Sequence, residues 1–190
     1  SAVSLSAALL QATGRMIIGT GVTSLFRRHP HVLAMEVATL NELSHGRFIL
    51  GLGAAEHLLA SYGMKVSVVQ GMREAVEMIR GVLSKDGFSY RGEVFALNTP
   101  QMRLPTTNLL IYMGSIHPKM LDLAGELTDG LLTPRSGGFS LDYVKYAIDR
   151  VVKSAEMNGR DPNSINFLAF FETALSLDGE AAKKSVKKIL

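Results

Sequence analysis

The chain has 190 residues, of which 47% are hydrophobic and 19% are charged, and its formal net charge is +3. This balance is typical of a globular chain with a sizeable core and excludes an intrinsically disordered one. The basic residues form no phosphate-tracking stripe, so we expect no nucleic-acid partner. The absence of cysteine excludes disulfides and thiolate metal sites, and it favours a cytoplasmic protein.

The first predicted element is a helix. Residues 1–10, SAVSLSAALL, are apolar and small, but they lack a basic leader and are too short to span a membrane. We therefore expect no membrane contact. The pattern predicts a helix over residues 5–13 that ends at Gly14, since glycine is a common C-terminal cap.

Residues 16–56 form the predicted centre of the fold. Two short apolar strands, over residues 16–22 and 48–52, flank an amphipathic helix over residues 31–43 that ends at Gly46. Both strands run into glycine-containing loops, GTGVT and GLGAAE. Such a strand–helix–strand unit places both loops at the carboxyl edge of a parallel sheet, where ligands bind in α/β folds.

The rest of the chain continues this alternation. Apolar spacings of three and four predict a helix from Met72 to Leu83, and FSYRGEVFAL predicts a hairpin that turns at Arg91 and Gly92. The further predicted elements are strand 109–113, helix 120–127, strand 129–133, helix 141–155, strand 165–175 and helix 179–190.

Strands that alternate with helices are joined by right-handed crossovers into a parallel sheet. No linker separates two domains, so we expect residues 1–190 to form a single α/β domain. Its open sheet would have two bare edges, and we expect a homodimer that covers them.

Three loops at predicted strand ends are candidate ligand sites. GTGVT, residues 19–23, is either a glycine-rich strand end or a close approach to a ligand. GLGAAE, residues 51–56, imitates a dinucleotide-binding motif, but Glu56 stands at the third glycine position and no clear helix follows, so we reject a Rossmann site. GSIHPKM, residues 114–120, suits either an anion cradle or a simple N-cap by Ser115 or His117.

Glu56 directly follows a predicted strand. Its carboxylate is either an acid or base of a site at the sheet edge or one half of a loop salt bridge. The five histidines form no i, i+4 pair on a helix and have no carboxylate at ligand spacing, so we expect no metal site.

Taken in order, six motifs resemble the bacterial luciferase-like flavoprotein superfamily. More narrowly, they resemble its branch that uses the deazaflavin coenzyme F420, which includes methylenetetrahydromethanopterin reductase. The motifs extend from residue 15 to about residue 133: GTGVT, RHP, ATLNELSHGRFILGLGAAE, YRGEVF, IYMGSIHPKM and AGELTDG.

The resemblance implies a TIM-barrel-type fold of parallel strands with alternating helices. A complete barrel has eight strands in about 250 residues, and the five strands predicted here match the third to the seventh. We therefore expect an incomplete barrel. Three explanations remain open: a piece of a longer protein, a sheet closed by a partner chain, or a reduced relative.

The resemblance also implies a function and a site. The function is that of an F420-dependent oxidoreductase, which transfers a hydride between the deazaflavin and a carbon of a small substrate, with Glu56 as proton donor or electrostatic partner. A cis peptide bond is implied between Gly21 and Val22, behind the ring. The implied coenzyme-binding residues are Gly21, Val22 and Thr23 at the ring and Gly114, Ser115, Ile116 and His117 at the phosphate.

Two alternatives belong to the same superfamily: an FMN-dependent monooxygenase, and a short flavin-binding relative without catalysis.

Three positions also depart from the family pattern. Asn41 replaces an aspartate, so we expect a neutral hydrogen bond between Asn41 and Arg47 in place of an ion pair. Ala55 and His117 both replace glycine, and the bulk of His117 crowds the phosphate, although an imidazolium could pair with it.

Overall fold

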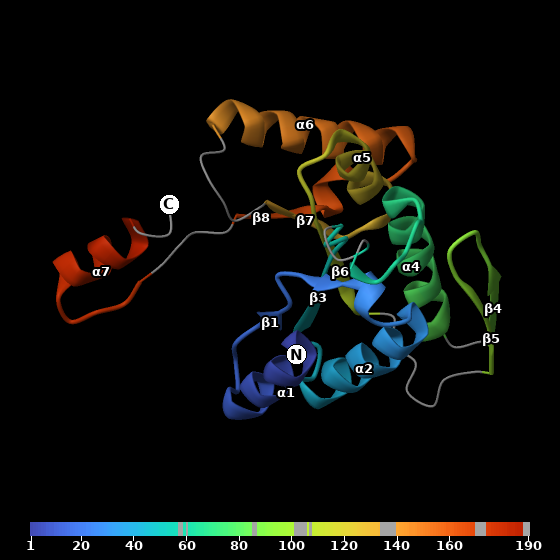
Figure 1. Cartoon of the computed structure of the whole chain (residues 1–190), viewed down its shortest axis with the longest axis horizontal. Helices are drawn as coiled ribbons and strands as arrows, with labels where there is room; N and C mark the ends of the chain where they lie inside the picture. The colour runs from blue at the N-terminus through green and yellow to red at the C-terminus, as the bar shows by residue number, and fades with distance from the viewer. Residues whose placement is uncertain are drawn as a thin grey trace.

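The computed structural model describes residues 1–56, 59, 61–84, 87–100, 106, 108–133, 140–169 and 174–187. A parallel sheet runs through it in the order β1–β3–β6–β7–β8 (Figure 1). Every pair of neighbouring strands is parallel, as the alternation of strands and helices predicts. The strands are Ile18–Gly19 (β1), Phe48–Gly53 (β3), Leu110–Gly114 (β6), Gly130–Thr133 (β7) and Asn166–Ala169 (β8), and Thr23–Ser24 (β2) pairs with the carboxyl end of β3.

The helices pack against one another in chain order, α1 on α2, α2 on α4, α4 on α5 and α5 on α6. The Ser67 and Ser140 side chains cap the first turns of α4 and α6, and α5 begins at Pro118. The helices are Ala2–Ala12 (α1), Pro30–Leu43 (α2), Val68–Leu83 (α4), Pro118–Leu127 (α5), Leu141–Met157 (α6) and Gly179–Lys187 (α7), with short 3₁₀ turns at Leu25–Arg27 (η1) and Pro162–Ser164 (η2).

The two faces of the sheet differ. Side chains alternate along a strand, and on one face Phe48, Leu50 and Leu52 are buried in the core that the helices share. On the opposite face the register places Tyr112 between Gly51 and Gly130, and Leu110 and Leu168 are still 39% and 45% exposed. This second face is the one that lies inside a closed barrel. The structure is thus a half-barrel, which confirms the predicted incomplete barrel.

The prediction of one continuous strand over residues 16–22 is wrong. β1 ends at Gly19 and β2 begins at Thr23, and the peptide bond between Gly21 and Val22 is cis, as the resemblance implied. The last strand is also shorter than predicted. β8 ends at Ala169, residues 174 and 175 are not in a strand, and residues 170–173 lie outside the described part of the chain.

Two predicted helix ends have different outcomes. The predicted cap at Gly14 is wrong, because Thr13 is already extended, with a φ of −132°, and its Oγ1 donates a hydrogen bond to the carbonyl of Leu9 at 2.7 Å. The predicted end of α2 is confirmed. His45 and Gly46 have φ values of 53° and 81°, and the amide of Gly46 donates to the carbonyl of Asn41 at 2.9 Å.

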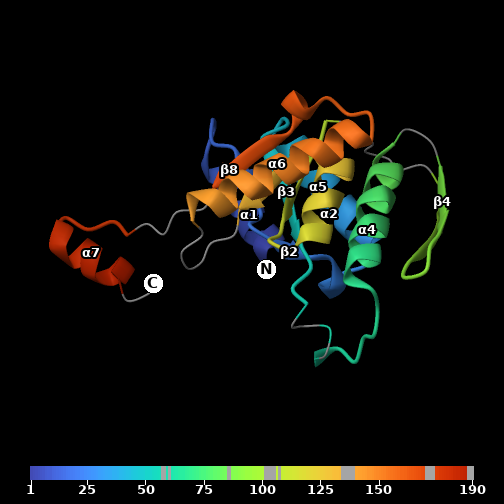
Figure 2. The same cartoon turned by 90° about the horizontal axis from the view of Figure 1, so that it is seen from above.

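The predicted hairpin is confirmed. Phe88–Arg91 (β4) and Ala96–Thr99 (β5) pair antiparallel and lie along α4, outside the main sheet (Figure 2). The fully buried carboxylate of Glu74 holds the turn between the two strands. It accepts hydrogen bonds from three backbone amides at 2.7 to 2.9 Å, those of Glu93, Val94 and Phe95.

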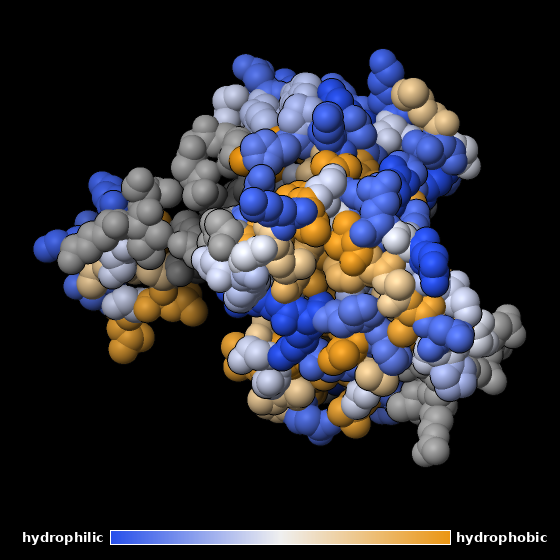
Figure 3. Space-filling view, turned by 45° about the vertical axis from the view of Figure 1, so that its right-hand side comes forward, coloured by the Kyte–Doolittle hydropathy of each residue, from blue (hydrophilic) through white to orange (hydrophobic). Residues whose placement is uncertain are grey.

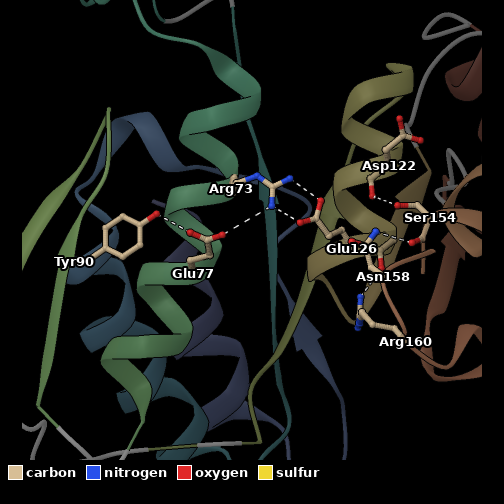
Figure 4. Close-up of polar contacts among 9 residues, drawn as sticks. Arg73, Glu77, Tyr90, Asp122, Glu126, Ser154, Asn158 and Arg160 are labelled. Atoms are coloured by element: carbon tan, nitrogen blue, oxygen red, sulfur yellow. Dashed lines mark hydrogen bonds and ion pairs between the residues drawn. The ribbon is translucent and has the colours of Figure 1, made fainter. Parts of the chain in front are cut away.

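Polar contacts fix the helices relative to one another (Figure 4). Arg73 of α4 forms a bidentate ion pair with Glu126 of α5, in which Nη2 lies 2.6 Å from Oε2. On the other side of α5, the Ser154 hydroxyl donates to the carbonyl of Asp122 at 2.6 Å. Arg160 donates to the carbonyl of Gly125 at 2.7 Å. These contacts set the position of α5, and therefore of the loop that precedes it.

The C-terminal segment lies away from the sheet and its helices (Figures 1 and 2). No described residue of α7 is buried, and Leu175 and Leu177 are essentially fully exposed. Apolar atoms show on this segment in Figure 3. The predicted helix over residues 179–190 is described only as far as Lys187. Within the described residues, none of the helices combines the length and the apolar character needed to cross a bilayer.

Candidate functional site at the carboxyl edge of the sheet

Val22 lies across the carboxyl ends of two strands. A Cβ atom built at Gly114, the last residue of β6, would lie 2.7 Å from Cγ1 of Val22, and one built at Gly53, the last residue of β3, would overlap with Cγ2. The Val22 side chain is nevertheless 40% exposed. It therefore contacts both strand ends and still presents an apolar surface at this edge of the sheet.

The bulge that carries Val22 is fastened to β3 on both sides. Before it, the buried Oγ1 of Thr20 donates to the carbonyl of Gly51 at 2.8 Å and accepts from the amide of Gly51 at 2.9 Å. After it, the Ser24 hydroxyl donates to the carbonyl of Ala54 at 3.1 Å. A Cβ at Gly51 would overlap with the carbonyl of Thr20, so this glycine permits a close approach between backbone segments.

The loop that follows β6 runs from Gly114 to His117. Ser115 and Ile116 are partly exposed and His117 is exposed. The amide of His117 donates to the Ser115 hydroxyl at 3.3 Å, and the carbonyl of Ile116 accepts from the Tyr143 hydroxyl at 2.6 Å. His117 occupies the N-cap position of α5, but its side chain makes no capping hydrogen bond. The loop therefore places partly exposed polar groups beside a helix N-terminus.

Glu56 lies in the loop that follows β3 and is exposed. Its carbonyl accepts a hydrogen bond from the amide of Leu59 at 3.0 Å. The preceding residue, Ala55, has a φ of 48°, which is left-handed backbone that favours glycine. This conformation accounts for the glycine that the family pattern has at position 55, which alanine replaces here. The next residue, His57, lies outside the described residues.

A cavity of about 230 Å³ opens beside Val22. Arg28 forms an ion pair at its rim with Glu36 of α2, at 3.0 Å. Arg27 is a lining residue that the sequence analysis missed, because the RHP motif drew attention to Arg28 alone. The cavity brings two of the three predicted ring-binding residues, Val22 and Thr23, together with Ala55, the neighbour of Glu56. Its other lining residues are Ser1, Ala2, Ser24, Arg27 and Arg28.

The predicted site residues thus lie along one edge of the sheet. Val22 meets Gly114 directly, Thr23 pairs with Leu52 near the end of β3, and Glu56 lies in the next loop. The roles of these residues in binding the coenzyme and transferring a proton stay predictions. Tyr143 was not predicted as part of this edge. No sequence signal could have found it, because its contact with Ile116 depends on how α6 packs on α5.

The expected hydrogen bond between Asn41 and Arg47 is absent. Asn41 donates instead to the Thr106 hydroxyl at 2.8 Å, and its Oδ1 is buried without a partner among the described residues. Arg47 reaches across to three backbone carbonyls, those of Leu10, Met16 and Ser44. Both residues therefore join structural elements, and neither lies among the candidate site residues.

The described residues contain no group of three or more histidine, aspartate or glutamate side chains placed to hold a metal ion. At the carboxyl edge, Val22 supplies an apolar side chain, and the loop after β6 supplies backbone amides and the Ser115 hydroxyl.

The family described as luciferase-like monooxygenase matches residues 1–190. The chain belongs to this family. It is 33% identical over 186 residues to a 5,10-methylenetetrahydromethanopterin reductase of Methanolobus tindarius, a match that covers 96% of this chain and 55% of the relative. It is 29% identical over 189 residues to an F420-dependent glucose-6-phosphate dehydrogenase of Kribbella flavida, covering 95% and 56%.

Solved structures show the same fold. The coenzyme F420-dependent tetrahydromethanopterin reductase of Methanopyrus kandleri superposes with a TM-score of 0.86 at 24% identity, covering 100% of this chain and 59% of the other. An F420-dependent secondary alcohol dehydrogenase, solved with an F420–acetone adduct, also gives a TM-score of 0.86 at 24% identity, covering 98% and 58%. The chain spans about half the length of the curated relatives it matches.

Proposed function

We propose that this chain is all or part of a coenzyme F420-dependent oxidoreductase, which transfers a hydride between the deazaflavin and a carbon atom of a small substrate. The proposal draws on the relatives named above, several of which are F420-dependent oxidoreductases by name. The structural observation that carries it is the exposed Val22 side chain beside the Gly114–His117 loop, on one edge of the sheet.

These groups fit the parts of the coenzyme. An apolar side chain held against two strand ends suits one face of a planar ring, so Gly21, Val22 and Thr23 would lie behind the deazaflavin. Amides and a hydroxyl next to a helix N-terminus suit a phosphate. Gly114, Ser115, Ile116 and His117 would therefore take the phosphate. The coenzyme supplies the hydride chemistry when bound, and the protein supplies position and electrostatics.

We propose that Glu56 holds the proton that accompanies hydride transfer. Its place after β3, in the loop next to the Val22 cavity, supports this role. Replacement of Glu56 by glutamine keeps the shape of the side chain but removes the proton-transfer group. Because general acid–base catalysis contributes about 10² to 10⁴ in rate, we expect the kcat for oxidation of reduced F420 to fall by at least about a hundredfold.

The Glu56→Gln variant should bind F420 as tightly as the wild type. Glu42→Gln, at an exposed position of α2, is the matched control and should retain full turnover. Unchanged turnover in Glu56→Gln would rule out the assigned role.

An FMN-dependent monooxygenase is the second candidate function. It is favoured by the family's description and by the fold shared with the monooxygenase RslO1 of Streptomyces bottropensis, whose TM-score is 0.83. A yellow purified protein with flavin absorbance would favour it.

We also propose a cytoplasmic homodimer. β1 and β8 are the end strands of the sheet, and Met16 and Ile17, which lead into β1, are 57% and 67% exposed. An unpaired strand edge beside exposed apolar side chains favours association with a second copy. Sedimentation equilibrium should give a molar mass twice that of one chain. In the Ile17→Lys variant the measured mass should fall toward that of one chain. A wild-type protein that sediments as a monomer would contradict the dimer.

A further inference from the structure

The hydroxyl of Tyr143 reaches the candidate phosphate loop from a different helix. It donates a hydrogen bond to the carbonyl oxygen of Ile116 at 2.6 Å. Tyr143 lies in the first turn of α6, where its own amide is capped by the Ser140 hydroxyl at 3.2 Å. Because α6 packs along α5 and α5 starts directly after the loop, this bond joins the loop to the helix pair beside it.

This contact controls the orientation of one peptide group. The peptide between Ile116 and His117 is trans, and in a planar trans peptide the C=O and the N–H point in opposite directions. The C=O is held by Tyr143, and the N–H donates to the Ser115 hydroxyl at 3.3 Å. Both ends of the same peptide group are thus fixed, with the carbonyl turned toward α6.

We propose that Tyr143 is a positioning residue for the phosphate of the coenzyme, an inference that rests on the proposed function. It keeps the 116–117 peptide from rotating. Rotation would turn a carbonyl oxygen, an electron-rich acceptor, toward an anion that requires N–H donors. Burial, followed by the neighbouring Tyr146, raises the pKa of Tyr143, so the hydroxyl keeps the proton that it donates.

The phosphate supplies a sharp test, because the chromophore also exists without it. Replacement of Tyr143 by phenylalanine keeps the ring and removes only the hydroxyl. We expect the Kd for F420, measured by fluorescence titration, to rise by up to about tenfold, since the net contribution of one neutral hydrogen bond corresponds to at most about that factor. The Kd for 8-hydroxy-5-deazariboflavin, which has no phosphate, should stay at the wild-type value.

Two further variants complete the test. Tyr146→Phe is the matched control, because Tyr146 lies one turn along α6 and its hydroxyl accepts from Arg150 at 3.3 Å, outside the loop. It should bind both ligands as the wild type does. Ser115→Ala removes a proposed phosphate contact together with the other anchor of the same peptide, so it should weaken F420 binding without affecting the phosphate-free chromophore. Thermal melting checks that each variant is folded.

Several results would overturn the proposed role of Tyr143. Wild-type affinity of Tyr143→Phe for F420, or an equal loss of affinity for both ligands, would overturn the positioning role. An unchanged F420 affinity in Ser115→Ala would contradict the place of Ser115 in the proposed phosphate site, on which the inference rests. Failure of the wild-type protein to bind F420 would contradict the proposed function itself, and this inference with it.

Discussion

Val22 fills the space that a side chain at Gly114 would need, since its Cγ1 lies 2.7 Å from the Cβ position there. The two residues do not belong to paired strands. β3 lies between β1 and β6 in the sheet, so Val22 reaches across the end of β3 to meet the end of β6. The segments that we propose bind the ring and the phosphate are therefore in direct contact, and a change in one should be measurable in the other.

Replacement of Gly114 by alanine tests this contact. The added methyl group must displace Val22, whose branched side chain has little rotamer freedom, or the end of β6. Overpacking of this kind costs about 1–3 kcal/mol in the free energy of unfolding, and we expect F420 binding to weaken by at least about tenfold. Calorimetry and fluorescence titration measure the two effects.

Gly14→Ala is the control for this substitution, because nothing lies within 4 Å of a Cβ at that position. It should leave both properties unchanged. A Gly114→Ala protein with wild-type coenzyme affinity would show that Val22 and the loop after β6 do not form one site.

Replacement of Ala55 by glycine should stabilise the protein. Ala55 has a φ of 48°, and left-handed backbone costs an L-residue about 1–2 kcal/mol, whereas glycine adds about 0.4–1 kcal/mol of unfolded-state entropy. The balance predicts a gain of about 0.5–1 kcal/mol, or about 2 °C in Tm. Ala54→Gly, at a neighbour without positive φ, should instead destabilise. A lower Tm for Ala55→Gly would contradict this reading of the loop.

Glu74→Gln should destabilise the hairpin. Burial alone would raise the pKa of Glu74, but hydrogen bonds from Gln70 and from three backbone amides outweigh it and hold the pKa below its ordinary value. A glutamine amide cannot accept the bonds that the second carboxylate oxygen receives from Val94 and Phe95. Amides left buried without partners cost about 1–3 kcal/mol each, so we expect a loss of about 3 kcal/mol in urea unfolding at neutral pH.

The same carboxylate predicts a pH dependence. Because its folded-state pKa is lowered, its stabilisation is fully present above the ordinary carboxyl pKa and is lost as the pH falls through the folded-state value. The stability difference between wild type and Glu74→Gln should therefore shrink in acid. If the difference in unfolding free energy between the wild type and Glu74→Gln does not change with pH, protonation of Glu74 is not coupled to folding.

Much of the fold could be predicted from sequence, because hydrophobic period and glycine position are local signals. The order of strands and helices, the hairpin at Arg91 and Gly92 and the end of α2 at Gly46 follow from such patterns. The interruption of the first strand could not be read from periodicity. It depends on how the bulge at Val22 fits over Gly53, which lies in a different strand.

Side-chain partners were the harder part of the prediction. Arg47 was expected to bond with Asn41, but three backbone carbonyls satisfy its guanidinium, and Asn41 bonds with Thr106. Glu74 carries no motif, and its role appears only when α4 and the hairpin turn pack together. Contacts of this kind join segments that are far apart in the sequence, so they cannot be predicted from composition or from the spacing of residues.

The most direct test of the proposed function is a fluorescence titration of the purified protein with F420, with FMN as the comparison. We expect saturable binding of F420 at micromolar concentrations with one coenzyme per chain, and no saturable binding of FMN. Binding of FMN alone would favour the monooxygenase. Failure to bind either coenzyme would contradict the coenzyme site at the edge formed by Val22 and the Gly114–His117 loop.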